Sequence, residues 1–214
     1  MTPAIGVCDY GVGNVRSVER ALEVAGAQPV ISSDPRTIAR CDGVVLPGVG
    51  AFAIAARALR DTGLGDAVRD LARAGAPVLG VCLGHQLLFE RSEEGEGGEG
   101  LGLLPGRVVR LTPHGDLKVP HIGWNTVTVL RPSALLDGVE SGTHMYFVHS
   151  YAALPDAEDT VAVTDYGDRV VAAAERGAVM GTQFHPEKSG AAGLRVYANF
   201  AALCGARVPA SRAG

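Results

Sequence analysis

The stretch Pro77-Val-Leu-Gly-Val-Cys-Leu-Gly-His-Gln86 decides the fold. A short apolar strand ends at Cys82, and helix-forming residues follow it directly. Gly80 and Gly84 flank the cysteine and let the backbone bend sharply, as a turn that presents a nucleophile requires. The N–H groups of a helix that begins at Leu83 favour the thiolate. The flanks therefore predict a catalytic cysteine, although a lone cysteine in an apolar run is usually inert core.

A second segment, Phe184-His-Pro-Glu187, supplies an imidazole and a carboxylate. In an extended backbone, residues i and i+2 point to the same side. The spacing therefore predicts that His185 lies against Cys82, with Glu187 behind the ring to orient it. The two segments together predict a Cys-His-Glu hydrolase.

The composition is that of a globular protein. The chain has 214 residues and a hydrophobic fraction of 47%. This length suffices to bury a sizeable core, so we expect a single α/β domain over residues 1–214. The net charge is −4, with no basic stripe, which argues against a nucleic-acid partner and against a polybasic membrane anchor.

Four scattered cysteines, Cys8, Cys41, Cys82 and Cys204, form no CxxC pair. Neither a disulfide framework nor a metal site is expected, and a reducing compartment is favoured. The N-terminal stretch has no basic region before its short apolar run, which predicts a first strand rather than a signal peptide. No apolar run is long enough to span a bilayer. We therefore expect a cytoplasmic protein without a membrane partner.

Strands and helices alternate in the first half, which predicts a parallel sheet with helices on both faces and a site at the carboxyl ends of the strands. The second half changes to strands joined by turns, which indicates antiparallel or mixed pairing. The expected strands are 4–8, 28–32, 43–47, 77–81, 107–111, 126–130, 146–152, 160–164, 170–175 and 179–184. The expected helices are 15–25, 52–60, 64–74 and 194–203, with a short helical turn that opens at 33–35 and a solvated loop at 93–100.

Two glycine loops follow strands. Leu46-Pro-Gly-Val-Gly50 is either an oxyanion hole of backbone N–H groups or a plain tight turn. Gly11-Val-Gly-Asn14 begins like a dinucleotide fingerprint, but Arg16 stands where the third glycine belongs. No dinucleotide or other cofactor is therefore expected.

The remaining histidines are weaker candidates. His85 lies three residues beyond Cys82 and is poorly directed at the thiol. His144 and His149 are expected at structural or rim positions. Trp124 is either core or an interface anchor.

The chain resembles the class I (triad) glutamine amidotransferases, most closely the glutaminase subunits of imidazole glycerol phosphate synthase. The elbow around Cys82 and the His-Pro-Glu segment are common to all triad members. Pro120-His-Ile-Gly-Trp-Asn125, Phe147-Val-His-Ser-Tyr151 and His185-Pro-Glu-Lys-Ser189 are specific to this subfamily. The resemblance covers nearly the whole chain and implies a central, mostly parallel mixed sheet flanked by helices, with antiparallel strands in the C-terminal half.

The resemblance also implies residue roles. Cys82 attacks the carboxamide of L-glutamine, His185 shuttles the proton to ammonia, and Glu187 orients His185. The oxyanion hole is implied at Leu83 and in the Gly48 to Gly50 loop, with Val49 and Gly50. The residues that match the glutamine-binding positions are Gln86, Glu94, His149, Ser150 and Tyr151. The residues that match the partner interface are Asn14, Trp124, Tyr146 and Lys188.

The implied partner is a cyclase subunit with a (β/α)8 barrel, which receives ammonia through an internal tunnel. The heterodimer would form imidazole glycerol phosphate and AICAR in histidine biosynthesis. His85 departs from the subfamily, which more often has methionine there. Two alternatives stay open: a glutaminase subunit of anthranilate or aminodeoxychorismate synthase, for which His85 is typical, and a non-catalytic interaction subunit.

Overall fold

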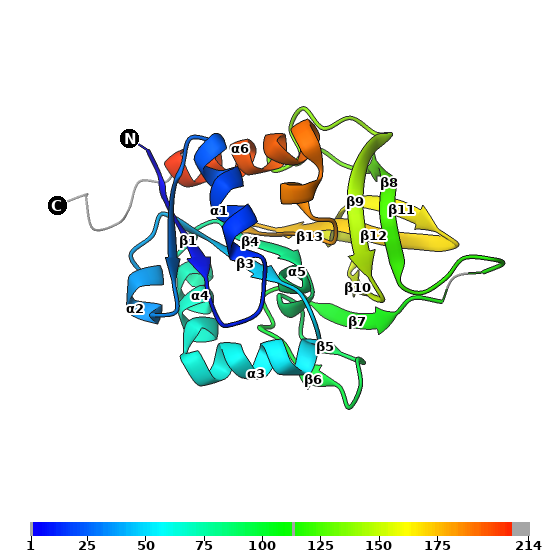
Figure 1. The fold of residues 1–214 in the computed structure, drawn as a ribbon, viewed down its shortest axis with the longest axis horizontal. Helices are drawn as coiled ribbons and strands as arrows, with labels where there is room; N and C mark the ends of the chain where they lie inside the picture. Colours follow the sequence, from blue (N-terminus) through cyan, green and yellow to red (C-terminus); the bar gives the residue numbers. More distant parts are fainter. Residues whose placement is uncertain (1, 113, 207–214) are drawn as a thin grey trace.

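A nine-stranded mixed sheet runs through the centre of the molecule (Figure 1). Its strand order is β2-β1-β3-β4-β13-β12-β11-β8-β9. The first five strands in this order pair in parallel, and the others pair antiparallel. Their bounds are β1 (Ala4–Cys8), β2 (Gln28–Ser32), β3 (Gly43–Gly48), β4 (Val78–Cys82), β8 (His121–Val129), β9 (Thr143–His149), β11 (Thr160–Tyr166), β12 (Asp168–Arg176) and β13 (Val179–Thr182).

A second, four-stranded sheet has the order β10-β7-β5-β6. Its strands are β5 (Arg91–Ser92), β6 (Gly98–Glu99), β7 (Gly106–Arg110) and β10 (Tyr151–Pro155). The computed structural model describes residues 2–112 and 114–206. The domain expected over residues 1–214 also includes residues 1, 113 and 207–214, which lie outside the described part.

Helices cover both faces of the large sheet (Figure 1). They are α1 (Val15–Val24), α2 (Pro35–Ile38), α3 (Phe52–Thr62), α4 (Leu64–Arg73), α5 (Leu83–Leu87) and α6 (Gly190–Ala206), with 3₁₀ turns η1 (Ala157–Asp159) and η2 (Pro186–Lys188). The apolar faces of α1 and α6 pack into one core, and those of α2, α3 and α4 pack into the other. None of the described helices is long and apolar enough to cross a membrane.

Local sequence signals explain where several helices begin and end. The side chain of Asn14 accepts a hydrogen bond from the N–H of Ser17 and caps α1. Asp34 caps α2 in the same way, with Pro35 in the first turn. Gly63, at φ +73°, ends α3 in the left-handed conformation and lets α4 begin at once. The helices predicted from 15, 52 and 64, and the helical turn predicted from 33–35, are therefore present in the structure.

The fold class is confirmed, and two predicted strands need correction. The strand predicted over residues 146–152 is two strands, β9 and β10, which belong to different sheets and are separated by Ser150 alone. The strand predicted over 126–130 begins five residues earlier, at His121, because β8 pairs with all of β9. In both places pairing between distant segments set the boundary.

Candidate active site

Cys82 stands at a strained turn between β4 and α5. Its φ of +54° and ψ of −108° make it the only non-glycine residue with positive φ in residues 2–112 and 114–206. Such a conformation costs about 1–3 kcal/mol and is characteristic of functional sites. The turn leaves the thiol at the end of a central parallel strand, where ligands bind in α/β sheets.

The glycines around Cys82 are required for space. Gly80 and Gly84 do not have positive φ, so they permit the sharp turn through their small size rather than through a left-handed backbone. A Cβ on Gly84 would overlap the carbonyl oxygen of Leu46, and a Cβ on Gly80 would lie 2.6 Å from the carbonyl oxygen of Gly84. The absent side chains therefore let α5 pack directly on β3 and β4, which holds Cys82 in its strained conformation.

Two polar groups contact the thiol of Cys82. The sulfur donates a hydrogen bond to the carbonyl of Val148, 3.8 Å away, and the side-chain amide of Gln183 donates to the sulfur at 3.8 Å. Both partners lie far from Cys82 in the sequence, on β9 and just after β13. The sequence analysis missed both, because nothing local to these residues identifies a thiol partner.

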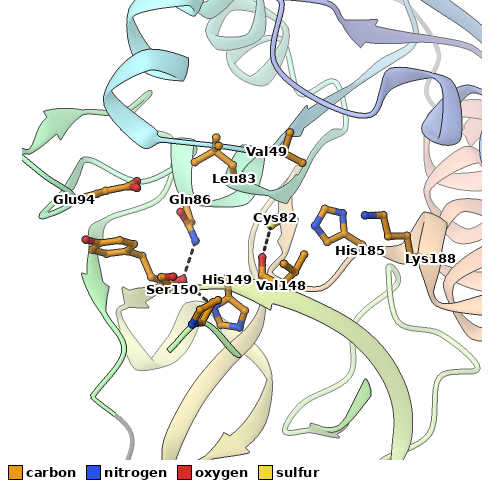
Figure 2. Close-up of a pocket in the computed structure, with 13 residues that line it drawn as sticks. Val49, Cys82, Leu83, Gln86, Glu94, Val148, His149, Ser150, His185 and Lys188 are labelled. Carbon is orange, nitrogen blue, oxygen red and sulfur yellow. Dashed lines mark hydrogen bonds between the residues drawn. The ribbon is translucent and has the colours of Figure 1, made fainter. Parts of the chain in front are cut away.

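His185 lies next to Cys82 (Figure 2) and forms a buried pair with Glu187. His185 Nδ1 lies 2.7 Å from Glu187 Oε1. The pairing occurs as predicted, but the predicted extended backbone is wrong, because residues Pro186–Lys188 form a 3₁₀ turn. The hydroxyl of Ser189 donates to the carbonyl of His185 and accepts from the N–H of Tyr146, which fixes this turn against β9.

The environment of His185 favours its protonated form. Burial opposes protonation, but the interactions with Cys82 and then with Glu187 outweigh burial and raise the pKa of His185 to about 9. Nε2 is buried and makes no hydrogen bond to any described residue. Glu187 holds the opposite nitrogen, so Nε2 is the ring atom left for a reacting group.

The thiol and the imidazole face a cavity of about 420 Å³. The cavity is lined by all five residues predicted for glutamine binding and by Leu83, Val49 and Gly50 of the predicted oxyanion hole, together with Cys82, His185 and Lys188. Gly48 of the same loop does not line it. The cavity is also lined by Pro120 and Val148, which the sequence analysis did not identify. The predicted lining residues are Val49, Gly50, Leu83, Gln86, Glu94, His149, Ser150 and Tyr151.

Three of the predicted glutamine-binding side chains, those of Gln86, Glu94 and His149, make hydrogen bonds within the protein. The side-chain amide of Gln86 donates to the carbonyl of Tyr151 at 2.8 Å and to Gln183 Oε1 at 3.0 Å. Glu94 Oε2 accepts from the N–H of Phe52 at 2.8 Å. Glu94 therefore connects the loop predicted over residues 93–100 to Phe52. Phe52 is the first residue of α3 and lies two residues after Gly50, which lines the cavity.

The predicted interface residues lie partly beside the cavity. Trp124 is 56% exposed, and its ring makes an edge contact with Tyr146 at 6.1 Å between centroids. Lys188 Nζ lies 5.7 Å from the centre of the Tyr146 ring, in cation–π geometry. Asn14 has a local role as the cap of α1.

His85 is fully buried and does not line the cavity. Neither ring nitrogen makes a hydrogen bond to a described residue, and burial lowers the pKa of His85 to about 3. Its ring makes an edge contact with Phe89. The structure therefore agrees with the prediction that His85 is not directed at the thiol.

No metal site is apparent in the described residues. No group of three or more His, Cys, Asp or Glu side chains is arranged there to hold an ion, and Cys8, Cys41 and Cys82 are free thiols. The polar groups of the cavity are instead arranged around the thiol.

Comparison with known proteins agrees with this geometry. Residues 6–203 match the model of the family described as glutamine amidotransferase class-I. The chain belongs to this family. The subunit HisH of imidazole glycerol phosphate synthase from Geobacillus thermodenitrificans is 53% identical to this class-I amidotransferase, over 90% of this chain and 92% of the relative. The HisH subunit from Methanosarcina mazei is 48% identical, over 94% of this chain and 98% of the relative.

Solved structures share the fold of this class-I amidotransferase at low identity. A crystal structure of a glutamine amidotransferase has a TM-score of 0.73 at 22% identity, covering 94% of this chain and 98% of that chain. PurLQS from Thermotoga maritima has a TM-score of 0.69 at 20% identity, covering 94% of this chain and 98% of that chain. Both confirm the predicted α/β architecture.

Proposed function

We propose that this class-I amidotransferase is the glutaminase subunit of imidazole glycerol phosphate synthase and hydrolyses L-glutamine to glutamate and ammonia. The buried His185–Glu187 pair beside a strained Cys82 is the observation that carries the chemistry. The subunit assignment rests on relatives about half identical over most of both chains. No cofactor or metal is needed for this reaction.

Cys82 is the proposed nucleophile. Its thiolate attacks the amide carbon of glutamine, and the carbonyl oxygen becomes an oxyanion. His185, protonated at Nε2, donates that proton to the leaving nitrogen, so that ammonia departs and a thioester remains. His185 then removes a proton from water, which attacks the thioester and releases glutamate and the thiol. Glu187 stays ionised and holds the ring through Nδ1.

The oxyanion would be stabilised by backbone N–H groups from two neighbouring segments. Leu83 begins α5 directly after Cys82, and Val49 and Gly50 follow the adjacent strand β3 and also line the cavity. Because Gly50 has a φ of +97°, this part of the loop is in a conformation that glycine tolerates best. Rotation of a peptide in this loop is therefore sterically inexpensive and is a candidate control point.

The other residues that line the cavity would bind the glutamine substrate. Glu94 supplies a negative charge for the substrate ammonium group, and Gln86 supplies an amide. His149, Ser150 and Tyr151 lie on the wall formed where the chain passes from β9 to β10. We assign these five residues to glutamine binding.

The proposed partner is a (β/α)8-barrel cyclase, and the proposed assembly is a heterodimer in the cytoplasm. Trp124 and Tyr146 form an aromatic pair on the β8–β9 hairpin, and Lys188 extends it to the mouth of the cavity. Aromatic residues of this kind are enriched in interfaces. Docking on this surface, with Asn14 at its border, would place the barrel where ammonia leaves. We propose that residues 1–214 act in it as one domain.

Co-expression with the cyclase from the same organism tests this function. We expect the two chains to co-purify and, when the cyclase substrate is supplied, to form imidazole glycerol phosphate with glutamine as the source of nitrogen, while the free chain releases little glutamate. The anthranilate alternative predicts association with a chorismate enzyme instead, and the relatives reported above do not favour it. A complex that forms but releases no glutamate would support the non-catalytic alternative.

A further inference from the structure

The carbonyl of Tyr151 is the end of a hydrogen-bonded chain that starts outside the cavity. His149 Nδ1 lies 2.9 Å from this carbonyl, and His149 Nε2 lies 3.0 Å from His121 Nδ1. His121 Nε2 lies 3.3 Å from the side-chain nitrogen of Asn125. Both imidazoles are buried, and His121 and His149 are directly opposite each other on β8 and β9.

The two ends of this chain determine where each proton lies. The Tyr151 carbonyl only accepts, so His149 carries its proton on Nδ1 and accepts at Nε2. His121 must then donate from Nδ1 and accept at Nε2. Asn125 supplies that last proton, because its amide nitrogen also donates to the carbonyl of Asp165 at 2.9 Å and its oxygen accepts from the N–H of Thr126. The donors therefore run in one direction, from Asn125 to Tyr151.

Protonation of either ring would interrupt the chain, since one nitrogen would then present an N–H to another N–H. Burial lowers the pKa of His121 and of His149 to about 4, which keeps both rings neutral at neutral pH. The ring of His121 is also held in place by stacking on Phe147, at 4.8 Å, and on Tyr166, at 4.0 Å.

The hydrogen-bonded chain ends at the backbone of Tyr151, in the segment that lines the cavity and is proposed to bind glutamine. Tyr151 O accepts from Gln86 as well as from His149, so it is held from α5 by one hydrogen bond and from the last residue of β9 by the other. Ser150 is the only residue between β9 and β10, and its carbonyl is bonded to Leu111. The wall of the cavity is thus a short crossover between two sheets, and its position depends on these contacts.

We propose that His121 and Asn125 are positioning residues for glutamine binding, which act by fixing the backbone of His149, Ser150 and Tyr151 through this chain. The role rests on the proposed glutaminase function. Neither residue lines the cavity, and they act on the substrate only through His149. The effect should therefore appear in KM for glutamine more than in kcat, because the thiol, imidazole and carboxylate are untouched.

The first test observes the protons directly. The full chain labelled with ¹⁵N-histidine is examined by long-range ¹H–¹⁵N correlation spectroscopy at pH 7 and pH 5.5, with His121→Phe and H149F variants to assign the signals. We expect both rings to be neutral with the proton on Nδ1 at both pH values. A ring that is protonated, or that carries its proton on Nε2, at pH 7 overturns the proposal.

The second test measures glutaminase kinetics in the complex with the cyclase and its bound ligand. His121→Phe keeps the stacked ring but removes both nitrogens, and we expect KM to rise about tenfold with kcat within about threefold of wild type. His121→Asn retains an amide donor near Nδ1 and should recover part of the loss. His114→Phe, at an exposed histidine, is the matched control and should leave KM unchanged.

The outcomes test the positioning role of His121 and the proposed glutaminase function separately. If the folded His121→Phe complex, checked by its thermal unfolding temperature, has the KM of wild type, the positioning role is overturned while the glutaminase function stands. If the wild-type complex hydrolyses no glutamine, the proposed function and the positioning role fall together. A raised KM with partial recovery in His121→Asn supports the role, because a general loss of stability would not discriminate between the two variants.

Discussion

His185 Nδ1 lies 2.7 Å from Glu187 Oε1, and both side chains are only 2% exposed. A carboxylate that is buried at this distance accepts a hydrogen bond from Nδ1–H and stabilises the imidazolium. Nε2 is thereby left to exchange protons with the thiol, ammonia and water. The pair is formed within a single 3₁₀ turn, so its geometry does not depend on the movement of another element.

Cys82→Ala should abolish glutamine hydrolysis and leave the fold and the partner affinity unchanged. Loss of the nucleophile costs several orders of magnitude in comparable triads. Glutamate release is measured in the complex, with Cys41→Ala as a control at a thiol that lies away from the cavity. Residual activity within about tenfold of wild type would show that Cys82 is not the nucleophile.

The free energy of unfolding should respond to pH through His185. Its folded pKa of about 9 lies above the ordinary value of 6.5, so the folded state binds the extra proton between these values. The stabilisation is therefore complete below about pH 6.5 and is lost as pH rises through 9, on the order of 1–3 kcal/mol. Glu187→Gln should flatten this decline in denaturant titrations at pH 6.5 and 9.

The titration of Cys8 contributes equally to both proteins in that comparison. Burial raises the pKa of Cys8 to about 12, which also weakens the fold at high pH, but this contribution is common to wild type and Glu187→Gln. The difference between the two pH profiles therefore isolates His185. Identical slopes would mean that Glu187 does not stabilise the imidazolium.

His85→Met should preserve activity and raise the free energy of unfolding by about 1 kcal/mol at pH 7, because the variant removes a buried ring without hydrogen bonds. The gain should grow to about 2–3 kcal/mol at pH 5. The folded pKa of about 3 lies below the unfolded value, so stability falls as pH decreases from 6.5 towards 3. His144→Met is an exposed control. A large loss of turnover would place His85 in the catalytic machinery.

Gly84→Ala should disrupt the turn that presents Cys82. The added methyl group would overlap the carbonyl of Leu46, so α5 must move away from β3. We expect a loss of about 1–3 kcal/mol in the free energy of unfolding, together with loss of glutaminase activity. Gly205→Ala in α6 meets its nearest atom at 3.9 Å and should be neutral or slightly stabilising. Equal stability of the two variants would contradict the close packing of α5.

Lys188→Ala should weaken coupling to the cyclase without affecting the thiol. Lys188 lines the cavity mouth next to the Tyr146 ring, and we expect it to meet an acidic residue of the partner. The dissociation constant, measured calorimetrically, should rise about tenfold, or stimulation by the partner should fall by a similar factor. Alkylation of Cys82 should proceed as in wild type. Lys118→Ala is the control, at an exposed lysine.

An unchanged complex with full stimulation in Lys188→Ala would remove this residue from the interface. Full glutaminase activity in the free chain, unaffected by the partner, would contradict control of the glycine loop by docking. Neither result would alter the arrangement of Cys82, His185 and Glu187.

The alternation of strands and helices, the turn at Cys82 and the proximity of His185 to Glu187 could all be predicted from sequence. Each of these features depends on residues within a few positions of one another. The signals are the periodicity of apolar residues, the spacing of glycines, and helix N-caps followed by proline, such as Asp34 with Pro35. The resemblance to the triad amidotransferases located the cavity lining for the same reason, since its motifs are contiguous stretches. Such signals can be read from the sequence because the local conformational preference of a segment acts whether or not the rest of the chain has folded.

Other features were decided only by the tertiary structure. The break at Ser150, the contact of Gln183 with Cys82 across 101 positions and the pairing of His121 with His149 arise from the order of strands in two sheets. Strand order depends on which distant apolar faces are buried together, and no local pattern reports it. The direction of the hydrogen bonds between Asn125, His121, His149 and Tyr151 depends in turn on those contacts. A histidine ring adopts one tautomer only when its hydrogen-bond partners are in place.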